Sequence, residues 1–281
     1  MVDILSGIAA TIAHLTSLAV IVLNGVVSFF FLLRKHPNRR ADFFHALLLL
    51  SFAGTTLHQL LLHNGFFSKT PAWRFLPVYG TLSFGTFLFY AVKLRIFPGY
   101  RFVRSDVKHF LLPVGQFLYF AGLFWGTSAD YRADVGRSLL SPFYGGLEML
   151  LYIGTFYAYQ FGAYRYIHFK VAVLQKKEPG ETERLYSLLI LRRMLRVMLV
   201  LFWMNSAYIA GDFLLEQWMG IDLYNRRWFR YLGALSFALL GGWVGVSSVQ
   251  LLYPPSYVNF SSLVVRWLKG MVNSKLPNTL P

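Results

Sequence analysis

Long apolar stretches separated by short polar segments dominate the chain. Seven of these stretches each hold close to the roughly 20 residues that an α-helix needs to cross a bilayer. The sequence therefore predicts an all-α fold, specifically a polytopic membrane protein built as a seven-transmembrane-helix bundle. The expected helices are residues 8–33, 43–62, 75–92, 110–126, 142–163, 195–215 and 231–252.

The pattern divides the chain into residues 1–253, the seven-helix transmembrane domain, and residues 254–281, a cytoplasmic tail. Two prolines directly after the last apolar stretch end its helix. In the tail, residues 261–272 place apolar side chains at helical spacing beside two basic ones, which predicts a short amphipathic helix in the lipid headgroup region. Residues 182–196 are expected to be helical and to run straight into the sixth membrane helix, below the membrane.

The charge distribution predicts the orientation. Only 14% of the residues are charged, whereas soluble domains carry about a quarter. The net charge is +15, and twenty of the 27 Lys and Arg residues fall in segments 34–40, 93–108, 165–196 and 266–275. These segments alternate correctly for seven spans with the N-terminus outside and the C-terminus inside. The charge therefore predicts a cytoplasmic face that meets anionic lipids rather than direct binding of nucleic acid.

Motifs of several enzyme classes are missing from the sequence. It has no His-Glu-x-x-His, no P-loop and no Gly-x-Ser-x-Gly, and its lack of cysteine excludes disulfides and thiolate metal ligands. The last apolar stretch has no lysine, which excludes a retinal Schiff base there. Gly241 and Gly245 in that stretch form a small-x-x-x-small pair, which favours close packing against another helix of the chain.

Ionisable residues at membrane depth are the informative ones, because each is costly there without a partner. The topology places such residues, and further polar ones, in the outer half of four helices, and this indicates a small-molecule cavity open to the outside. No catalytic residue, metal or cofactor is assigned. The predicted ligand-binding residues are His14, His58, Gln59, Glu148, Tyr152, Asn205, Tyr208 and Asp212.

Other interpretations of this polar set stay open. It could be a buried hydrogen-bond network, as in a structural subunit of a membrane complex. It could also serve an intramembrane enzyme that uses His58, Glu148 and Asp212, with or without a metal, although no pair has a local ligand-motif spacing. Glu148 is expected to face the bundle interior, with His58 or His14 as its leading partner, and Asp212 to lie near Arg226 or Arg230.

Two stretches carry a resemblance to a known family. They are "FFFLLRKHPNRRADFFHALLLL" at residues 29–50 and "FLFYAVKLRIFPGYRFVRSDVKHFLLPVGQF" at residues 87–117. The chain resembles the seven-helix sensor region of bacterial membrane-anchored AraC-type regulators and of some histidine kinases. The resemblance implies a sensor in the bacterial inner membrane. No helix-turn-helix or kinase follows residue 252, so the signal is expected to pass to a cytoplasmic or membrane protein partner.

Overall fold

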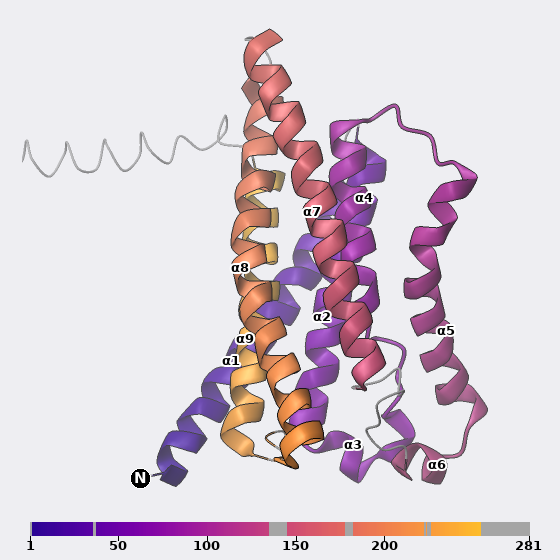
Figure 1. Cartoon of the computed structure of the whole chain (residues 1–281), viewed down its shortest axis with the longest axis vertical. Helices are drawn as coiled ribbons and strands as arrows, with labels where there is room; N and C mark the ends of the chain where they lie inside the picture. Colours follow the sequence, from indigo (N-terminus) through magenta and orange to yellow (C-terminus); the bar gives the residue numbers. More distant parts are fainter. Residues whose placement is uncertain are drawn as a thin grey trace, which may run out of the picture.

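The computed structural model describes residues 2–35, 38–134, 145–177, 182–221, 223 and 226–253. Over these ranges every regular element is an α-helix or a 3₁₀-helix, which confirms the predicted all-α fold. Figure 1 shows an elongated bundle in which most helices run along the long axis and α1 crosses it obliquely. The predicted tail and its amphipathic helix lie outside the described residues.

Each of the seven predicted helices overlaps one long helix of the structure. Short elements join them: α3 (Phe66–Lys69), α6 (Ala129–Asp134) and the 3₁₀ turns η1 (Pro71–Trp73), η2 (Thr81–Ser83) and η3 (Arg104–Phe110). The long helices are α1 (Val2–Leu33), α2 (Arg39–His63), α4 (Phe84–Ile96), α5 (Leu111–Gly126), α7 (Gly146–Lys177), α8 (Thr182–Met219) and α9 (Arg227–Leu252).

The predicted start of the third helix at residue 75 is wrong, because α4 begins at Phe84. Pro77 lacks the N–H that a helix interior needs, and the chain here runs through irregular turns instead. The backbone carbonyl of Val78 approaches Gly54 of α2 so closely that a Cβ on Gly54 would overlap it. This approach places Tyr79 and η2 against the bundle interior.

The helices α7 and α8 are longer than a membrane span. They contain 32 and 38 residues, or about 48 and 57 Å at 1.5 Å per residue, whereas the hydrocarbon core is about 30 Å thick. Figure 1 shows both projecting beyond the other helices at one end. Ile167 and Val171 of α7 and Leu188 and Leu191 of α8 are buried. The expected continuity of residues 182–196 with the sixth helix is confirmed.

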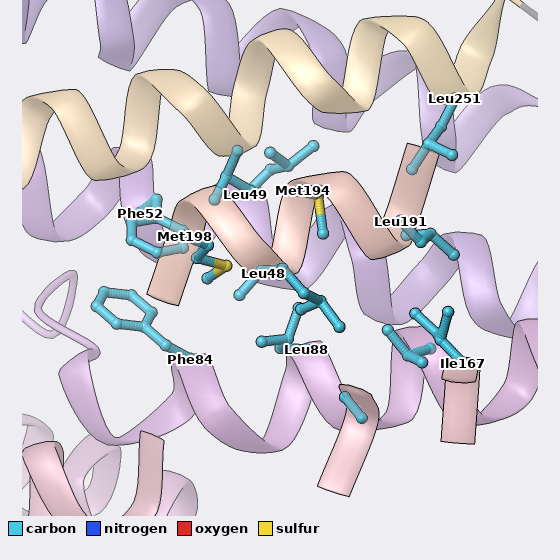
Figure 2. Packing of buried hydrophobic residues seen from close by; sticks show 14 of the residues in the cluster. Leu48, Leu49, Phe52, Phe84, Leu88, Ile167, Leu191, Met194, Met198 and Leu251 are labelled. Atoms are coloured by element: carbon cyan, nitrogen blue, oxygen red, sulfur yellow. The ribbon is translucent and has the colours of Figure 1, made fainter. Parts of the chain in front are cut away.

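One apolar core runs through α1, α2, α4, α7, α8 and α9. Phe52 of α2 stacks on Phe84 of α4 with ring centroids 4.2 Å apart, and Phe237 of α9 packs beside both rings. Figure 2 shows Leu48 of α2 next to Leu88 of α4, and Leu49 of α2 on the side of Met194 of α8. Helix α2 is therefore the centre of the bundle.

The glycine pair of α9 faces α1. A Cβ on Gly245 would lie 2.5 Å from Asn24 Oδ1 and 2.8 Å from a Leu23 methyl carbon, so only glycine fits. The Asn24 amide donates to the Gly241 carbonyl at 3.2 Å. The prediction that this pair packs within the chain is confirmed.

In the part of the chain that the structure describes, four helices are long and apolar enough to cross a membrane: Ala9–Leu33, Arg39–His63, Arg104–Gly126 and Trp228–Leu252. Large apolar side chains on the outside of the bundle agree with this. Leu15 and Val22 of α1 are 62% and 63% exposed, and Trp125 of α5 is 71% exposed. Outward apolar surface on this scale is typical of contact with lipid or with another protein.

The ends of α1, α2, α4 and α9 meet at one end of the bundle. Arg40 donates to the carbonyls of Pro98 and Tyr100, which joins the start of α2 to the turn after α4. Arg34 donates to the Leu251 carbonyl at 3.4 Å. Asp42 and Arg95 form a buried ion pair between α2 and α4, which the sequence analysis did not predict.

Candidate functional site

A cavity of about 110 Å³ lies among α2, α7, α8 and α9, at the end of the bundle that carries α3. We call it the polar cavity. One water needs roughly 10–15 Å³ by the same measure, so the polar cavity has room for a small molecule. Its polar lining consists of Gln59, His63, Tyr79, Thr81, Glu148, Tyr152, Asn205, Tyr208, Asp212 and Arg230.

Six of the eight predicted ligand-binding residues line this cavity. Gln59 comes from α2. Helix α7 contributes Glu148 and Tyr152 one turn apart, and α8 contributes the remaining three at spacings of three and four residues. Such spacings place side chains on one face of a helix, so the sequence was sufficient to find this set. The three residues of α8 are Asn205, Tyr208 and Asp212.

The other two predicted residues are not among those that line the polar cavity in the described part of the chain. His58 is fully buried in an aromatic cluster, with ring centroids 4.9 Å from Phe67 and 5.1 Å from Tyr79. His14 is half-buried and its ring meets Tyr231 edge-on at 6.0 Å. His58 therefore does not share the cavity with Glu148 and Asp212, as the enzyme alternative required.

Glu148 is buried and faces the bundle interior, as predicted. The Thr81 hydroxyl donates to its carboxylate at 2.6 Å, and the Gln116 amide donates to the same oxygen at 3.4 Å. The Gln116 amide also donates to Thr81 at 3.0 Å. These two partners come from η2 and α5, elements that the sequence analysis did not connect with Glu148.

Gln116 is held from both ends of its amide. Its oxygen accepts from the Leu82 backbone N–H at 3.0 Å while its nitrogen donates to Thr81 and Glu148. Thr81 and Gln116 were missed by the sequence analysis because their partners are far apart in the chain. A buried amide in an otherwise apolar helix is the signal that could have found Gln116.

The opposite wall of the polar cavity joins α8 to α9. Tyr152 donates to Asn205 at 3.4 Å, and Asn205 donates to Ser236 at 3.0 Å. The Tyr208 hydroxyl donates to the Phe229 carbonyl, and the two rings stack with centroids 4.1 Å apart. A side chain on Gly233 would overlap the Tyr208 ring, so this glycine permits the stack.

The charged groups of the cavity are few. Asp212 and Arg230 both line it, in agreement with the expectation that Asp212 lies on the same surface as Arg230. Among the described residues no group of three or more His, Asp and Glu side chains could hold a metal ion. The arrangement can bind a polar or charged group through acceptors on α7 and α8, beside the Tyr and Phe rings of its walls.

The comparisons with known proteins give no family. No protein-family model matches the chain, and no curated protein matches it.

Proposed function

We propose that the chain is a seven-helix membrane sensor that binds a small ligand in the polar cavity and signals through its basic cytoplasmic face. The bacterial inner membrane is its proposed location. The observation that carries the proposal is the convergence of Gln59, Glu148, Tyr152, Asn205, Tyr208 and Asp212 from three helices on one cavity. Cavities with aromatic and aliphatic walls and a few polar groups are typical small-molecule sites.

The seven spans are the four apolar helices together with α4, α7 and α8. Residues 197–214 of α8 contain a single charged side chain, Asp212, so this part of α8 is apolar enough to enter a bilayer. Helix α4 has 13 residues, and η2 directly before it extends its path through the bundle. Its Leu88, Tyr90 and Val92 are completely buried, so protein rather than lipid surrounds most of it.

The orientation is N-terminus out and C-terminus in. The C-terminal end of α1, the connection after α4, the end of α7 and the start of α8 lie toward one end of the bundle (Figure 1). Most of the Lys and Arg residues belong to these segments, and such segments stay in the cytoplasm. The polar cavity then lies in the outer half.

The signal leaves through the projecting ends of α7 and α8. This pair is basic, with Arg165, Lys170, Arg192 and Arg193 among its charges, and Phe169 is 64% exposed on it. A cytoplasmic or membrane protein partner with an acidic surface suits this pair of helices. Anionic lipid headgroups suit the basic residues closer to the membrane.

Ligand binding is tested on the purified protein in lipid nanodiscs, by screening small polar molecules for an increase in thermal stability. A true ligand raises the unfolding temperature of the wild type. The variant Glu148→Gln should lose roughly tenfold in affinity, because a hydrogen bond to a charged group is stronger than one to a neutral group. The matched control is Asp130→Asn, an exposed carboxylate on α6 that does not line the cavity. Equal binding by the wild type and Glu148→Gln would contradict the proposed site.

A further inference from the structure

A second cavity of about 550 Å³ lies between α2, α4 and α5. We call it the lateral groove. Its walls are mostly apolar, with Leu47 and Leu50 from α2, Phe87 from α4, and Val114 and Phe117 from α5. Leu50, Val114 and Phe117 are also 43%, 49% and 51% exposed, so the groove opens on the outer surface of the bundle. That surface includes two of the four helices that are apolar enough to cross a membrane.

Helix α5 forms one side of the groove because it stands apart from the other long helices. Figure 1 shows α5 at the edge of the bundle, and its main contacts are with the turns η2 and η3 rather than with α2 or α4. Gln116 attaches its middle to η2 through the Leu82 N–H and Thr81. Gln116 therefore helps to hold the helix that borders the groove, together with Phe120, whose ring stacks on Tyr79 with centroids 5.4 Å apart.

The lateral groove and the polar cavity share a wall. Tyr79 lines both of them. Gln116 lines the groove, and its amide donates to Thr81 and Glu148, which line the polar cavity. The side chain of Gln116 therefore separates the polar cavity from the mostly apolar lateral groove.

We infer that the two spaces together bind a single-chain amphiphile with an amine headgroup, which arrives from the membrane. The headgroup occupies the polar cavity and the alkyl chain lies in the lateral groove, with Gln116 and Thr81 between them as the gate. This inference rests on the proposal that the polar cavity is a ligand site.

The charge of the polar cavity selects the amine. The described lining holds two carboxylates, Glu148 and Asp212, and one guanidinium, Arg230, so acidic groups are in excess by one when histidine is neutral. An ammonium group balances this excess, whereas a carboxylate headgroup adds to it. The alkyl chain belongs in the groove because most of the side chains that line it are apolar, with Ser51, Tyr79, Ser83 and Gln116 as the polar ones.

The depth of the two spaces fits a molecule that spans both. Along α2, the residues of the polar cavity are Gln59, Leu62 and His63, close to the end of the helix, whereas those of the groove lie between Leu47 and Gly54, in its middle. When the headgroup occupies the polar cavity, the alkyl chain therefore points toward the middle of the bilayer. This is the direction that a chain takes in one leaflet.

The test uses photoactivatable hexadecylamine, with a diazirine near the end of its chain, on the protein in nanodiscs. Labelled peptides are mapped by mass spectrometry after irradiation. We expect labels on the groove segments of α2 and α5, and a loss of roughly tenfold in labelling for Glu148→Gln, which weakens the headgroup contact. Hexadecanoic acid with the same diazirine should label these segments far less. Equal labelling by the amine and the acid would overturn the choice of headgroup.

A matched pair of variants tests the groove itself. Val114→Trp fills the groove and should abolish the label, whereas Leu118→Trp, on the same helix, 60% exposed and not lining the groove, should leave it unchanged. Circular dichroism and gel filtration check that both variants fold. Labels spread evenly over the outer surface of the wild type would overturn the inference without any variant.

Water-soluble butylamine separates this inference from the proposed function. If butylamine raises the unfolding temperature through Glu148 but hexadecylamine does not label the groove, the polar cavity stands as a ligand site and the groove is excluded. If neither amine binds, the amphiphile inference fails, and the proposed function then depends on the wider screen of polar molecules.

Discussion

Asp42→Asn should destabilise the protein by about 3 kcal/mol, because it leaves a buried guanidinium without its counter-ion. Asp42 is completely buried and Arg95 is 9% exposed. Removing one member of a buried ion pair costs about 3–5 kcal/mol, because the remaining charge stays away from water. The variant keeps the contact of the Arg95 guanidinium with Phe31, whose ring centroid lies 5.9 Å away. A contact of that kind contributes about 0.5–2 kcal/mol, so it offsets only part of the loss.

The assay is equilibrium unfolding of the purified protein in mild detergent, titrated with sodium dodecyl sulfate and followed by circular dichroism. The matched control is Arg101→Gln, which removes an exposed charge after α4 and should change the free energy of unfolding by less than about 0.5 kcal/mol. The double variant Asp42→Leu, Arg95→Met replaces the pair with apolar groups and should recover most of the stability. A loss below about 1 kcal/mol for Asp42→Asn, or a double variant as unstable as the single one, would refute this reasoning.

Three further predictions test the helix interface, the cavity wall and the orientation. Gly245→Val should destabilise the bundle by about 1–3 kcal/mol in the same titration, because its side chain overlaps Asn24 and Leu23; Gly7→Val, where no neighbour is within 4 Å, is the control. Thr81→Val should cost about 1–2 kcal/mol, because it removes the donor to Glu148, and no measurable loss would show that the bond contributes nothing. A reporter fused after Pro281 should be active only if it works in the cytoplasm, and a periplasmic signal would reverse the orientation.

The apolar stretches were sufficient to predict the helices because each helix is fixed by its own length and composition. The start of the third helix was one exception, and the end of the fifth was another, because α7 continues to Lys177 instead of ending at residue 163. The close approach of Val78 to Gly54 involves two segments far apart in the chain, and nothing in residues 75–83 alone shows that η2 rather than a helix forms there. The number of spans and their orientation stay predictions.

The cavity was predictable where one helix supplied several members. The spacing of Asn205, Tyr208 and Asp212 places them on one face of a helix, which can be recognised without knowing the fold. The partners of Glu148 were not predictable in this way, because they depend on how η2 and α5 pack against α7. His58 is a related case. It was predicted in the site because of its expected depth in the membrane, but its ring packs against Phe67 and Tyr79.

The length of α8 has a mechanical consequence. It runs without interruption from Thr182 to Met219, contains no proline, and has its only glycine at residue 211, beside the cavity residue Asp212. Thirty residues separate Thr182 from Asp212, which is about 45 Å of helix. If this rod pivots about its cavity end by about 5°, its far end moves by about 4 Å over that length. A rotation too small to disturb the packing of the cavity is thus magnified into a displacement of several ångströms at the far end of the helix.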